Sequence, residues 1–238
     1  MSILIDGREA ANIPPLANLG RVSRIDLVVK TGSAFQLGKA EIAPLAPQTE
    51  IPEGFRTGQP AELAVIRDTA QAGIEGWRAV GFAKAQISRE NVVADHPRSQ
   101  LNVELGIATG PRVSFGTLNV TGESKVRLNR IRKISAVPSG EVFDPVALER
   151  AATRLRRTGS FSSVTLREAD ALGPNNAMDV ELAVVDAKPR RFGFGAELHS
   201  SEGISLSGFW LHRNLLGGAE RFRIDAEVAG LAGENNGV

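Results

Sequence analysis

The 238-residue sequence contains no cysteine, almost no net charge and no long apolar run. Without cysteine, a disulfide framework, thiolate catalysis and cysteine-ligated metal are excluded. Lysine and arginine total 28 against 27 aspartate and glutamate, so no large basic field is available to bind nucleic acid. The absence of an apolar run of about 18 residues excludes a membrane-spanning helix, but membrane β-strands carry a much weaker hydropathy signal and are not excluded.

Side chains that could form a catalytic or metal centre are scattered. The three histidines, His96, His199 and His212, lack the spacing of metal ligands. Carboxylates are numerous, but no glycine-rich phosphate loop and no Gly-x-Ser-x-Gly motif accompanies them. We therefore expect no catalytic residue, no metal site, no cofactor and no enzymatic activity.

The main internal feature is a repeat of about 78 residues. The sequence pattern of residues 25–42 recurs at residues 103–120. Equivalent glycines in the two copies, Gly32 and Gly110 and also Gly38 and Gly116, are 78 positions apart. A third, shorter echo begins at Val180. Each copy reads as an alternating strand, a break and a second strand.

Helices are predicted between the echoes. In the second unit, Asp144 before Pro145 predicts a capped helix start, and Gly159 ends that helix 78 residues after Gly81 ends the helix of the first unit. A shorter helix is predicted within 126–137, with a distorted counterpart in the proline- and glycine-rich stretch 44–60. The core-facing positions are expected to be Leu63, Ile66, Ala70, Ile74 and Trp77 in the first unit, and Leu128, Ile131, Ile134, Leu148, Ala151, Ala152 and Leu155 in the second.

Two strands are predicted after each long helix, at 84–93 and 100–107 and again at 163–169 and 178–186. Each unit then reads strand, helix, helix, strand, strand, which predicts an α+β fold. By the same logic, 2–6 and 22–30 are the last two strands of an earlier unit, and 233–238 is a turn tip. The first half of that unit is missing, so we expect the chain to be a piece cut from a longer protein at both ends. The start is not a signal peptide, so if the protein is exported, its signal has been removed.

Strict alternation of polar and apolar residues distinguishes the segments 191–199 and 221–228. Phe192, Phe194, Ala196 and Leu198 share one face of the first, while charged residues and glycine occupy the other. A run of about 9 to 11 residues with one apolar and one polar face is typical of membrane β-barrel strands, with lipid outside and water inside.

This strand order, repeated and ending in Arg213-Asn-Leu-Leu-Gly-Gly218, resembles the polypeptide-transport-associated (POTRA) domains of the BamA and TamA outer-membrane assembly proteins. The TamA branch, the translocation and assembly module, is the most similar. The motifs that carry the resemblance are Val113-Ser-Phe-Gly116, Val120-Thr-Gly122, Pro138-Ser-Gly140, Phe143-Asp144, Arg154-Leu-Arg-Arg-Thr-Gly-Ser-Phe161, Pro189-Arg-Arg-Phe-Gly-Phe-Gly195 and Trp210-Leu-His-Arg-Asn-Leu-Leu-Gly-Gly218.

The resemblance implies tandem POTRA domains, each a three-stranded sheet covered by two helices on one face, followed by the first strands of an outer-membrane β-barrel. It divides the chain into 1–31, the C-terminal remnant of a first POTRA domain, two POTRA domains at 32–110 and 111–188, and an incomplete barrel at 189–238. It implies POTRA domains in the periplasm of a Gram-negative bacterium, anchored by the full-length barrel in the outer membrane. The implied partners are unfolded outer-membrane proteins or autotransporters and a TamB-like partner anchored in the inner membrane.

An edge strand offers unpaired backbone groups to an extended peptide, so a three-stranded sheet suits β-augmentation. The family places the strand after the second helix at the sheet edge. The alternative is an edge that is only solvated and is blunted by its charged side chains. The candidate docking residues are Lys84, Gln86, Ser88, Ser163, Thr165 and Arg167.

The signature turn comprises Arg213, Asn214, Leu215, Leu216, Gly217 and Gly218. Its polar pair is expected to bind backbone carbonyls and its glycine pair to adopt positive φ, with support of the turn favoured over direct substrate contact. The function implied is non-enzymatic client or partner binding. Two alternatives remain: the exporter region of a patatin-like phospholipase that carries POTRA domains and a barrel, and a POTRA scaffold that acts only in protein interactions.

Overall fold

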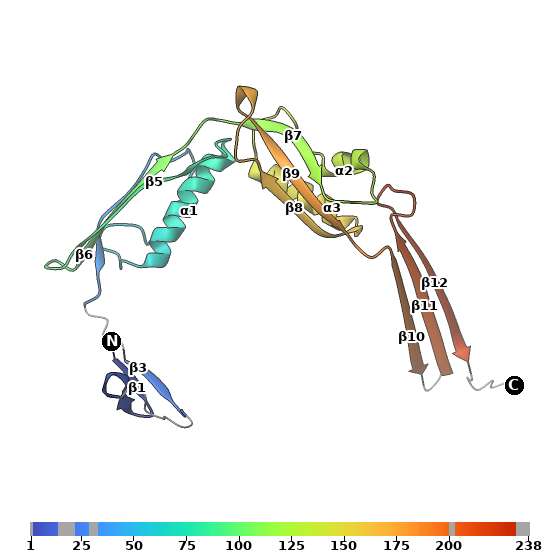
Figure 1. Ribbon diagram of the computed structural model, residues 1–238, viewed down its shortest axis with the longest axis horizontal. Helices are drawn as coiled ribbons and strands as arrows, with labels where there is room; N and C mark the ends of the chain where they lie inside the picture. Colours follow the sequence, from blue (N-terminus) through green and yellow to red (C-terminus); the bar gives the residue numbers. More distant parts are fainter. Residues whose placement is uncertain (1, 14–21, 29–32, 200–202, 232–238) are drawn as a thin grey trace. The chain divides into compact units, whose positions relative to one another are not determined.

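The computed structural model describes residues 2–13, 22–28, 33–199 and 203–231 (Figure 1). These residues fall into two compact units. The first lies within 1–44, 50–72 and 88–106, and the second within 45–49, 73–87 and 107–238. The end of the predicted strand 22–30 and the predicted turn tip at 233–238 lie outside the described residues.

The N-terminal sheet belongs to the first unit and has the order β2-β1-β3. Its strands are β1 (Ser2–Ile5), β2 (Arg8–Glu9) and β3 (Ile25–Val28), and a short 3₁₀ helix, η1 (Ala10–Asn12), follows β2. β1 pairs antiparallel with β3, so the two strands predicted in this region do lie side by side.

The next sheet has the order β4-β6-β5, with β4 (Gln36–Ala43) parallel to the central strand β6 (Gln100–Ala108) and β5 (Gln86–Asp95) at the far edge. One helix, α1 (Leu63–Ala79), accompanies it. The prediction of a second helix in this unit is wrong for the described residues, because the proline-rich stretch before α1 forms hydrogen-bonded turns instead. The core joins residues of the strands, of α1 and of the stretch before α1: Leu37, Phe55, Ile66, Val103 and Leu105.

One predicted core position of α1 is also wrong. Leu63, the first helical residue, is 61% exposed, whereas Thr69 is fully buried. The hydroxyl of Thr69 donates to the backbone carbonyl of Val65 at 2.7 Å, which satisfies its polar group inside the helix and allows a threonine at a buried position. The buried stripe therefore begins one turn later than the hydrophobic pattern predicts.

The second complete sheet, β7-β9-β8, carries both predicted helices. Its elements in chain order are β7 (Ser114–Thr121), α2 (Leu128–Ser135), α3 (Pro145–Arg157), β8 (Phe161–Glu168) and β9 (Ala177–Asp186), with a 3₁₀ turn, η2 (Pro174–Asn176), before β9. The Asp144 carboxylate accepts the Val146 N–H at 2.8 Å and caps α3, as predicted. Gly159 follows the helix at φ +69°, a conformation that glycine adopts without strain.

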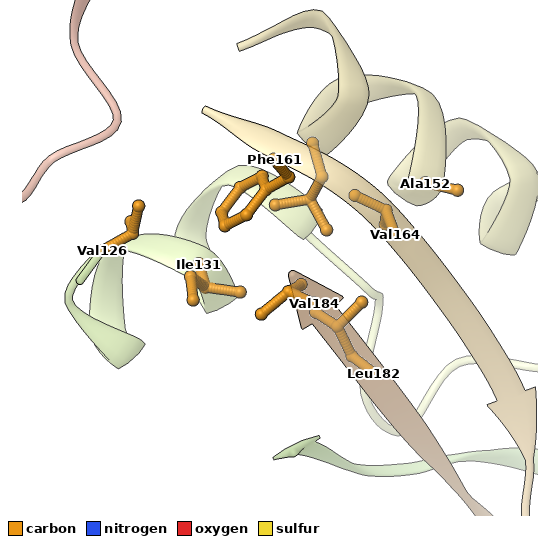
Figure 2. Packing of buried hydrophobic residues seen from close by; sticks show 8 residues of the cluster. Val126, Ile131, Ala152, Phe161, Val164, Leu182 and Val184 are labelled. Carbon is orange, nitrogen blue, oxygen red and sulfur yellow. The ribbon is translucent and has the colours of Figure 1, made fainter. Parts of the chain in front are cut away.

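The core beneath α2 and α3 is continuous and apolar. Figure 2 shows Ile131 of α2 and Ala152 of α3 facing Val164 of β8 and Leu182 of β9. Ile131 and Leu182 are fully buried, and complete burial of such a side chain contributes roughly 1.5–3 kcal/mol. Leu128, predicted to face the core, is exposed instead because it occupies the first position of α2.

The repeat has a structural counterpart at Gly38 and Gly116. Each glycine follows the start of the first strand, where the register of the parallel pairing shifts. A side-chain oxygen from the central strand fills the space that a β-carbon would occupy: Asn102 beside Gly38 and Asp179 beside Gly116. These oxygens accept the N–H of the next residue, Lys39 or Thr117, at 2.8 and 2.7 Å.

The C-terminal sheet has three long antiparallel strands in the order β10-β11-β12: β10 (Arg190–His199), β11 (Gly203–Arg213) and β12 (Arg221–Leu231). The predicted alternation is present. Phe192 and Phe194 lie on one face, where their cross-strand partners on β11 are Trp210 and Gly208. Gly193 lies on the other face, beneath the ring of its partner Phe209. Phe194 is 90% exposed and Leu198 is 81% exposed. The sheet is open, and the described residues form no closed barrel.

Candidate functional site

The outer edge of β8 is the part of the second unit best placed to accept another strand. β8 has β9 on one side, and no described strand pairs with its other side. The Ala169 N–H donates to the Asp179 carbonyl at 2.9 Å, and the pairing register runs unchanged from there to Ser163. Because antiparallel pairs alternate, the backbone groups of Val164, Leu166 and Glu168 point away from β9.

A groove runs beside this edge. It lies between α3 and β8 and has a volume of about 630 Å³. Leu148, Ala152 and Leu166 supply its apolar lining. At its rim, Arg156 pairs with Glu149 at 3.0 Å and also donates to the Val164 carbonyl at 3.4 Å. An extended segment added to β8 could therefore bond to the edge while an alternate side chain enters the groove.

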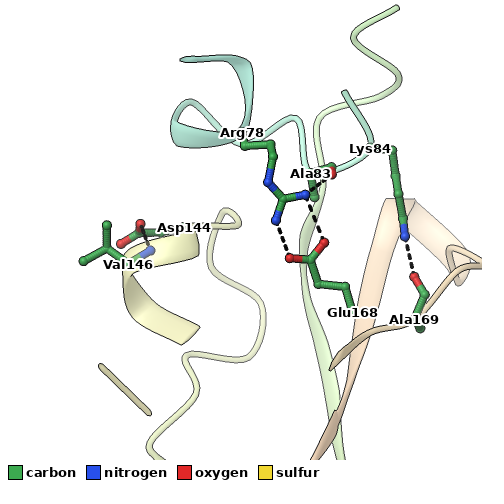
Figure 3. A network of polar contacts seen from close by, with 7 residues as sticks. All are labelled: Arg78, Ala83, Lys84, Asp144, Val146, Glu168 and Ala169. Atoms are coloured by element: carbon green, nitrogen blue, oxygen red, sulfur yellow. Dashed lines mark hydrogen bonds and ion pairs between the residues drawn. The ribbon is translucent and has the colours of Figure 1, made fainter. Parts of the chain in front are cut away.

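Residues from the C-terminal end of α1 and the loop after it contact the far end of β8 (Figure 3). Arg78 forms a two-point ion pair with Glu168, and its guanidinium also donates to the Ala83 carbonyl. Lys84 donates from Nζ to the Ala169 carbonyl at 2.6 Å. These contacts occupy the end of the edge and leave its middle, around Leu166, for a partner.

The opposite edge of the same sheet is partly occupied. The Phe115 N–H of β7 donates to the Glu141 carbonyl at 2.8 Å, and the Phe115 carbonyl accepts the Gly140 N–H at 2.7 Å. In the first unit, Leu37 of β4 makes the equivalent pair of bonds with Gln59 and Gly58. The loops before α3 and α1 therefore occupy the starts of β7 and β4, which makes β8 and β5 the more available edges.

The predicted docking residues lie close to these edges. The side chains of Ser163, Thr165 and Arg167 are exposed on β8. Their backbone N–H and C=O groups face β9, however, and the outward-facing backbone groups belong to the residues next to them. Gln86 and Ser88 lie on β5, which forms an edge of its sheet. Lys84 precedes β5 and makes the contact with Ala169 described above. No docking partner is present, so their role stays a prediction.

The predicted signature turn connects β11 to β12. Arg213 donates to the Lys188 carbonyl at 3.0 Å, whereas the Asn214 side chain, which was predicted to bind a carbonyl, accepts the Ala219 N–H at 3.0 Å. Gly217 has φ +79°, whereas Gly218 does not have the positive φ expected of it, and Ala219 has φ +64° instead. Leu215 and Leu216 are exposed.

The turn is bound to α2 from outside. The Arg127 N–H donates to the Gly217 carbonyl at 2.9 Å, and Arg130 donates to the Gly218 carbonyl at 3.0 Å. Arg127, at the start of α2, and Arg130, within it, thus each bind one carbonyl of the turn. These bonds fix the turn against the β7-β9-β8 domain. These contacts favour the structural role of the turn that the sequence predicts.

Sequence reasoning missed Glu220. Its carboxylate accepts the N–H groups of Gly218 at 2.9 Å and Leu216 at 3.2 Å. Hydrogen bonds from backbone N–H groups, with its own as the largest contribution, lower the pKa of Glu220, and the nearby Arg127 charge adds to this effect. An acidic residue two positions after a Gly-Gly pair is the only signal in the sequence that could have identified it.

The described residues contain no cluster of three or more histidine, cysteine, aspartate or glutamate side chains able to hold a metal ion. They also contain no helix of the length and apolar character needed to cross a membrane.

The fold defines a class of protein: repeated α+β domains with three-stranded sheets, followed by a long-stranded antiparallel sheet. Neither a scan against protein-family models nor a search of curated proteins found a match. Among solved structures, BamA from Haemophilus ducreyi lacking POTRA domains 1–3 is similar, with a TM-score of 0.67 and 14% identity over 83% of this chain. POTRA domains 3–5 of Haemophilus influenzae BamA match 64% of the chain, with a TM-score of 0.56 and 20% identity.

These similarities concern the fold. The repeated three-stranded sheets of this chain resemble tandem POTRA domains. The chain spans 37% of the length of the first of these structures and 61% of the second. No particular branch of the superfamily is distinguished by them.

Proposed function

We propose that this chain is the POTRA region and the opening barrel strands of a factor that assembles or translocates outer-membrane proteins. In this proposal, 32–110 and 111–188 are POTRA domains, 1–31 supplies closing strands of a further POTRA-type sheet, and 189–238 begins the barrel. The repeated sheets and their similarity to POTRA structures support this assignment. The role is binding rather than catalysis.

One observation carries the binding role: the outward backbone groups of Val164, Leu166 and Glu168 lie beside the groove under α3. Backbone pairing depends little on the sequence of the partner, which suits a receptor for many unfolded barrel precursors. We propose the same role for the outer edge of β5, where Gln86 and Ser88 lie.

The apolar face of β10, β11 and β12 supports the barrel proposal. Phe192, Phe194, Leu206 and Ile224 are exposed on it, and the strands are 10, 11 and 11 residues long. Strands of about 9–11 residues span a bilayer when tilted. An exposed apolar face of this size needs a covering partner, and lipid hydrocarbon fits it.

We further propose that the chain belongs to the TamA branch, on the basis of the motif from Arg213 to Gly218 and its neighbours. This places the POTRA domains in the periplasm of a Gram-negative bacterium. The partners would be unfolded outer-membrane proteins or autotransporters and a TamB-like inner-membrane-anchored protein. Copurification of such a partner with the full-length protein tests the branch, and recovery of phospholipase activity instead would contradict it.

Proline substitution tests the docking edge. Leu166→Pro removes the outward N–H at the centre of the free edge, a position where an edge strand tolerates proline. Leu166→Ala removes the same apolar contacts but keeps the N–H, so it is the matched control. A suitable probe is a synthetic peptide with the alternating sequence of residues 221–231.

We expect Leu166→Ala to bind the peptide at near wild-type affinity and Leu166→Pro to lose at least about tenfold, as measured by fluorescence anisotropy. Hydrogen exchange should show the Glu168 amide protected by the peptide in wild type and in the alanine variant only. Amide protection in β9 reports whether each variant keeps its fold. Unchanged peptide affinity in a folded Leu166→Pro variant would refute docking on β8.

A further inference from the structure

A cavity of about 500 Å³ lies in the second unit, where the β9–β10 connection meets the end of β11. We call it the junction pocket. Its volume is within the range of small-molecule sites, about 300–1,000 Å³. Four segments that are separate in the sequence build it: Lys125, Ser160, residues 186–190 and residues 212–214. The lining residues used below are Lys125, Ser160, Lys188, Arg190, His212 and Arg213.

The junction pocket is strongly basic. It has four cationic side chains and one carboxylate, that of Asp186. Both oxygens of that carboxylate are already engaged: one accepts the Ser124 hydroxyl at 2.7 Å and the other the Lys125 N–H at 2.8 Å. Among the described residues, the ion pairs found involve none of the four cations. With four cations and one carboxylate, the pocket therefore has an excess of positive charge.

Two polar atoms in the wall of the pocket lack partners. The hydroxyl of Ser160 and Nδ1 of His212 are both buried and without a hydrogen bond, and Ser160 as a whole is only 3% exposed. A buried polar atom without a partner is unfavourable and indicates a missing water, ion or ligand. Hydroxyl and imidazole N–H groups are good donors to phosphate oxygens.

From this combination we propose that the junction pocket binds a phosphate group carried by an anionic membrane lipid. Arg190 and Arg213 offer planar N–H pairs that match phosphate oxygens, and Lys125 and Lys188 add point charges. The choice of a lipid rests on the proposed function, because the pocket lies at the end of β10 from which the apolar face extends toward Phe192 and Phe194. If that face contacts hydrocarbon, the pocket lies at the depth of the lipid phosphates.

The test uses the full chain in two arms. The first arm titrates glycerol 3-phosphate and follows the nuclear magnetic resonance signals of the His212 ring and the residue 187–190 backbone. The second measures cosedimentation with phosphatidylcholine vesicles, with and without phosphatidylglycerol. The Lys188→Gln/Arg190→Gln variant removes two pocket charges, and Arg132→Gln/Lys133→Gln removes the same two charges from the exposed surface of α2.

We expect glycerol 3-phosphate to shift the pocket signals, and the pocket variant to bind it at least about tenfold more weakly than wild type and the α2 variant. Phosphatidylglycerol should strengthen vesicle binding, and the pocket variant should lose most of that gain, since each basic residue near an anionic surface contributes about fivefold. Binding to vesicles without phosphatidylglycerol should be unchanged.

The outcomes separate the two proposals. If vesicles bind but neither the phosphate probe nor the pocket variant has an effect, the pocket proposal is overturned while the membrane role of the sheet stands. If the phosphate probe binds but no vesicle does, the membrane lipid as its source is overturned together with the proposed membrane contact. Equal weakening by the α2 variant would mean that only overall charge matters, and would also overturn the pocket proposal.

Discussion

At the scale of single residues, Glu220 organises the turn between β11 and β12. Its carboxylate binds the N–H groups of Leu216 and Gly218, and Arg127 and Arg130 bind the carbonyls of Gly217 and Gly218. The Gly217–Gly218 peptide group is thus bound at both ends, its carbonyl by the Arg127 N–H and its N–H by the Glu220 carboxylate. The turn has positive φ at Asn214, Gly217 and Ala219, and these bonds hold it in one conformation.

The lowered pKa of Glu220 makes the turn sensitive to acid. A carboxyl group whose pKa is lower in the folded than in the unfolded chain stabilises the fold above its unfolded pKa, about 4.3, and loses that contribution as pH falls through the folded pKa. We expect Glu220→Gln to lower the melting temperature at pH 7, and the difference from wild type to vanish at low pH. Calorimetry between pH 7 and pH 2 measures this.

Glu227→Gln is the matched control, because it neutralises an exposed carboxylate on β12 of the same sheet. Its melting temperature should follow that of wild type across the pH range. A Glu220→Gln variant whose destabilisation is the same at every pH would contradict the assigned role of the charge.

At the scale of elements, the end of α1 is joined to β8 by Arg78. Its guanidinium binds Glu168 at two points and lies 5.2 Å from the centre of the Phe143 ring. The two charged side chains are only 26% and 21% exposed, so water screens their attraction less than on an open surface. This contact occupies the end of the β8 edge that we propose as the docking site.

A double-mutant cycle measures this contact. Arg78→Gln and Glu168→Gln should each destabilise the protein in urea unfolding, and their coupling should be roughly 1 kcal/mol, because the pair is bidentate and partly buried. The exposed pair Arg156 and Glu149 provides the control cycle, with coupling of about 0.5 kcal/mol or less. Equal coupling in both cycles would mean that the Arg78 contact is an ordinary surface pair.

At the scale of the whole molecule, the chain combines polar α+β domains with a sheet whose large apolar side chains face outward. The apolar face includes Phe194 and Leu198. The other face carries Phe209, whose ring centre lies 6.0 Å from the guanidinium of Arg191 and 4.1 Å from that of Arg223. Such two-faced strands suit a boundary between hydrocarbon and water. The edge that we propose for peptide binding and the face that we propose for membrane contact therefore lie on different elements, β8 and the β10-β11-β12 sheet.

Membrane contact should depend on the face and not on the total charge. Phe194→Glu places a charge on the apolar face and should weaken cosedimentation with phosphatidylcholine vesicles by about tenfold or more, because a charge in hydrocarbon is unfavourable. Ser207→Glu adds the same charge to the polar face of β11 and should have little effect. Similar losses for both variants would contradict lipid contact through the apolar face.

Much of the fold follows from local signals in the sequence. Asp144, Pro145 and Gly159 set the limits of α3 because capping and backbone preference act within a few residues. The missing helix in the first unit shows where such signals were too weak, since the repeat predicted two helices but proline and glycine prevented one. Leu63 and Leu128 were wrongly predicted to face the core. Each is the first residue of its helix, and such a residue can extend past the sheet that buries the remaining apolar residues of the helix.

The candidate site was only half predictable. Strand order placed Ser163, Thr165 and Arg167 on an edge strand, but the backbone groups that face outward are those of Val164, Leu166 and Glu168. That choice depends on the register with β9, which sequence alternation does not reveal. The occupied starts of β4 and β7 were likewise invisible, because they depend on loops that fold back across the sheet edge.

The sequence by itself determined the repeated unit, the ends of the main helices and the two-faced strands after Pro189, because period and capping are properties of neighbouring residues. Only the tertiary structure decided which edge is free, which carbonyls bind Arg127 and Arg130, and how Lys125, Ser160 and His212 come to line one pocket. Those features join residues from distant parts of the chain, and no local preference encodes the distances between them.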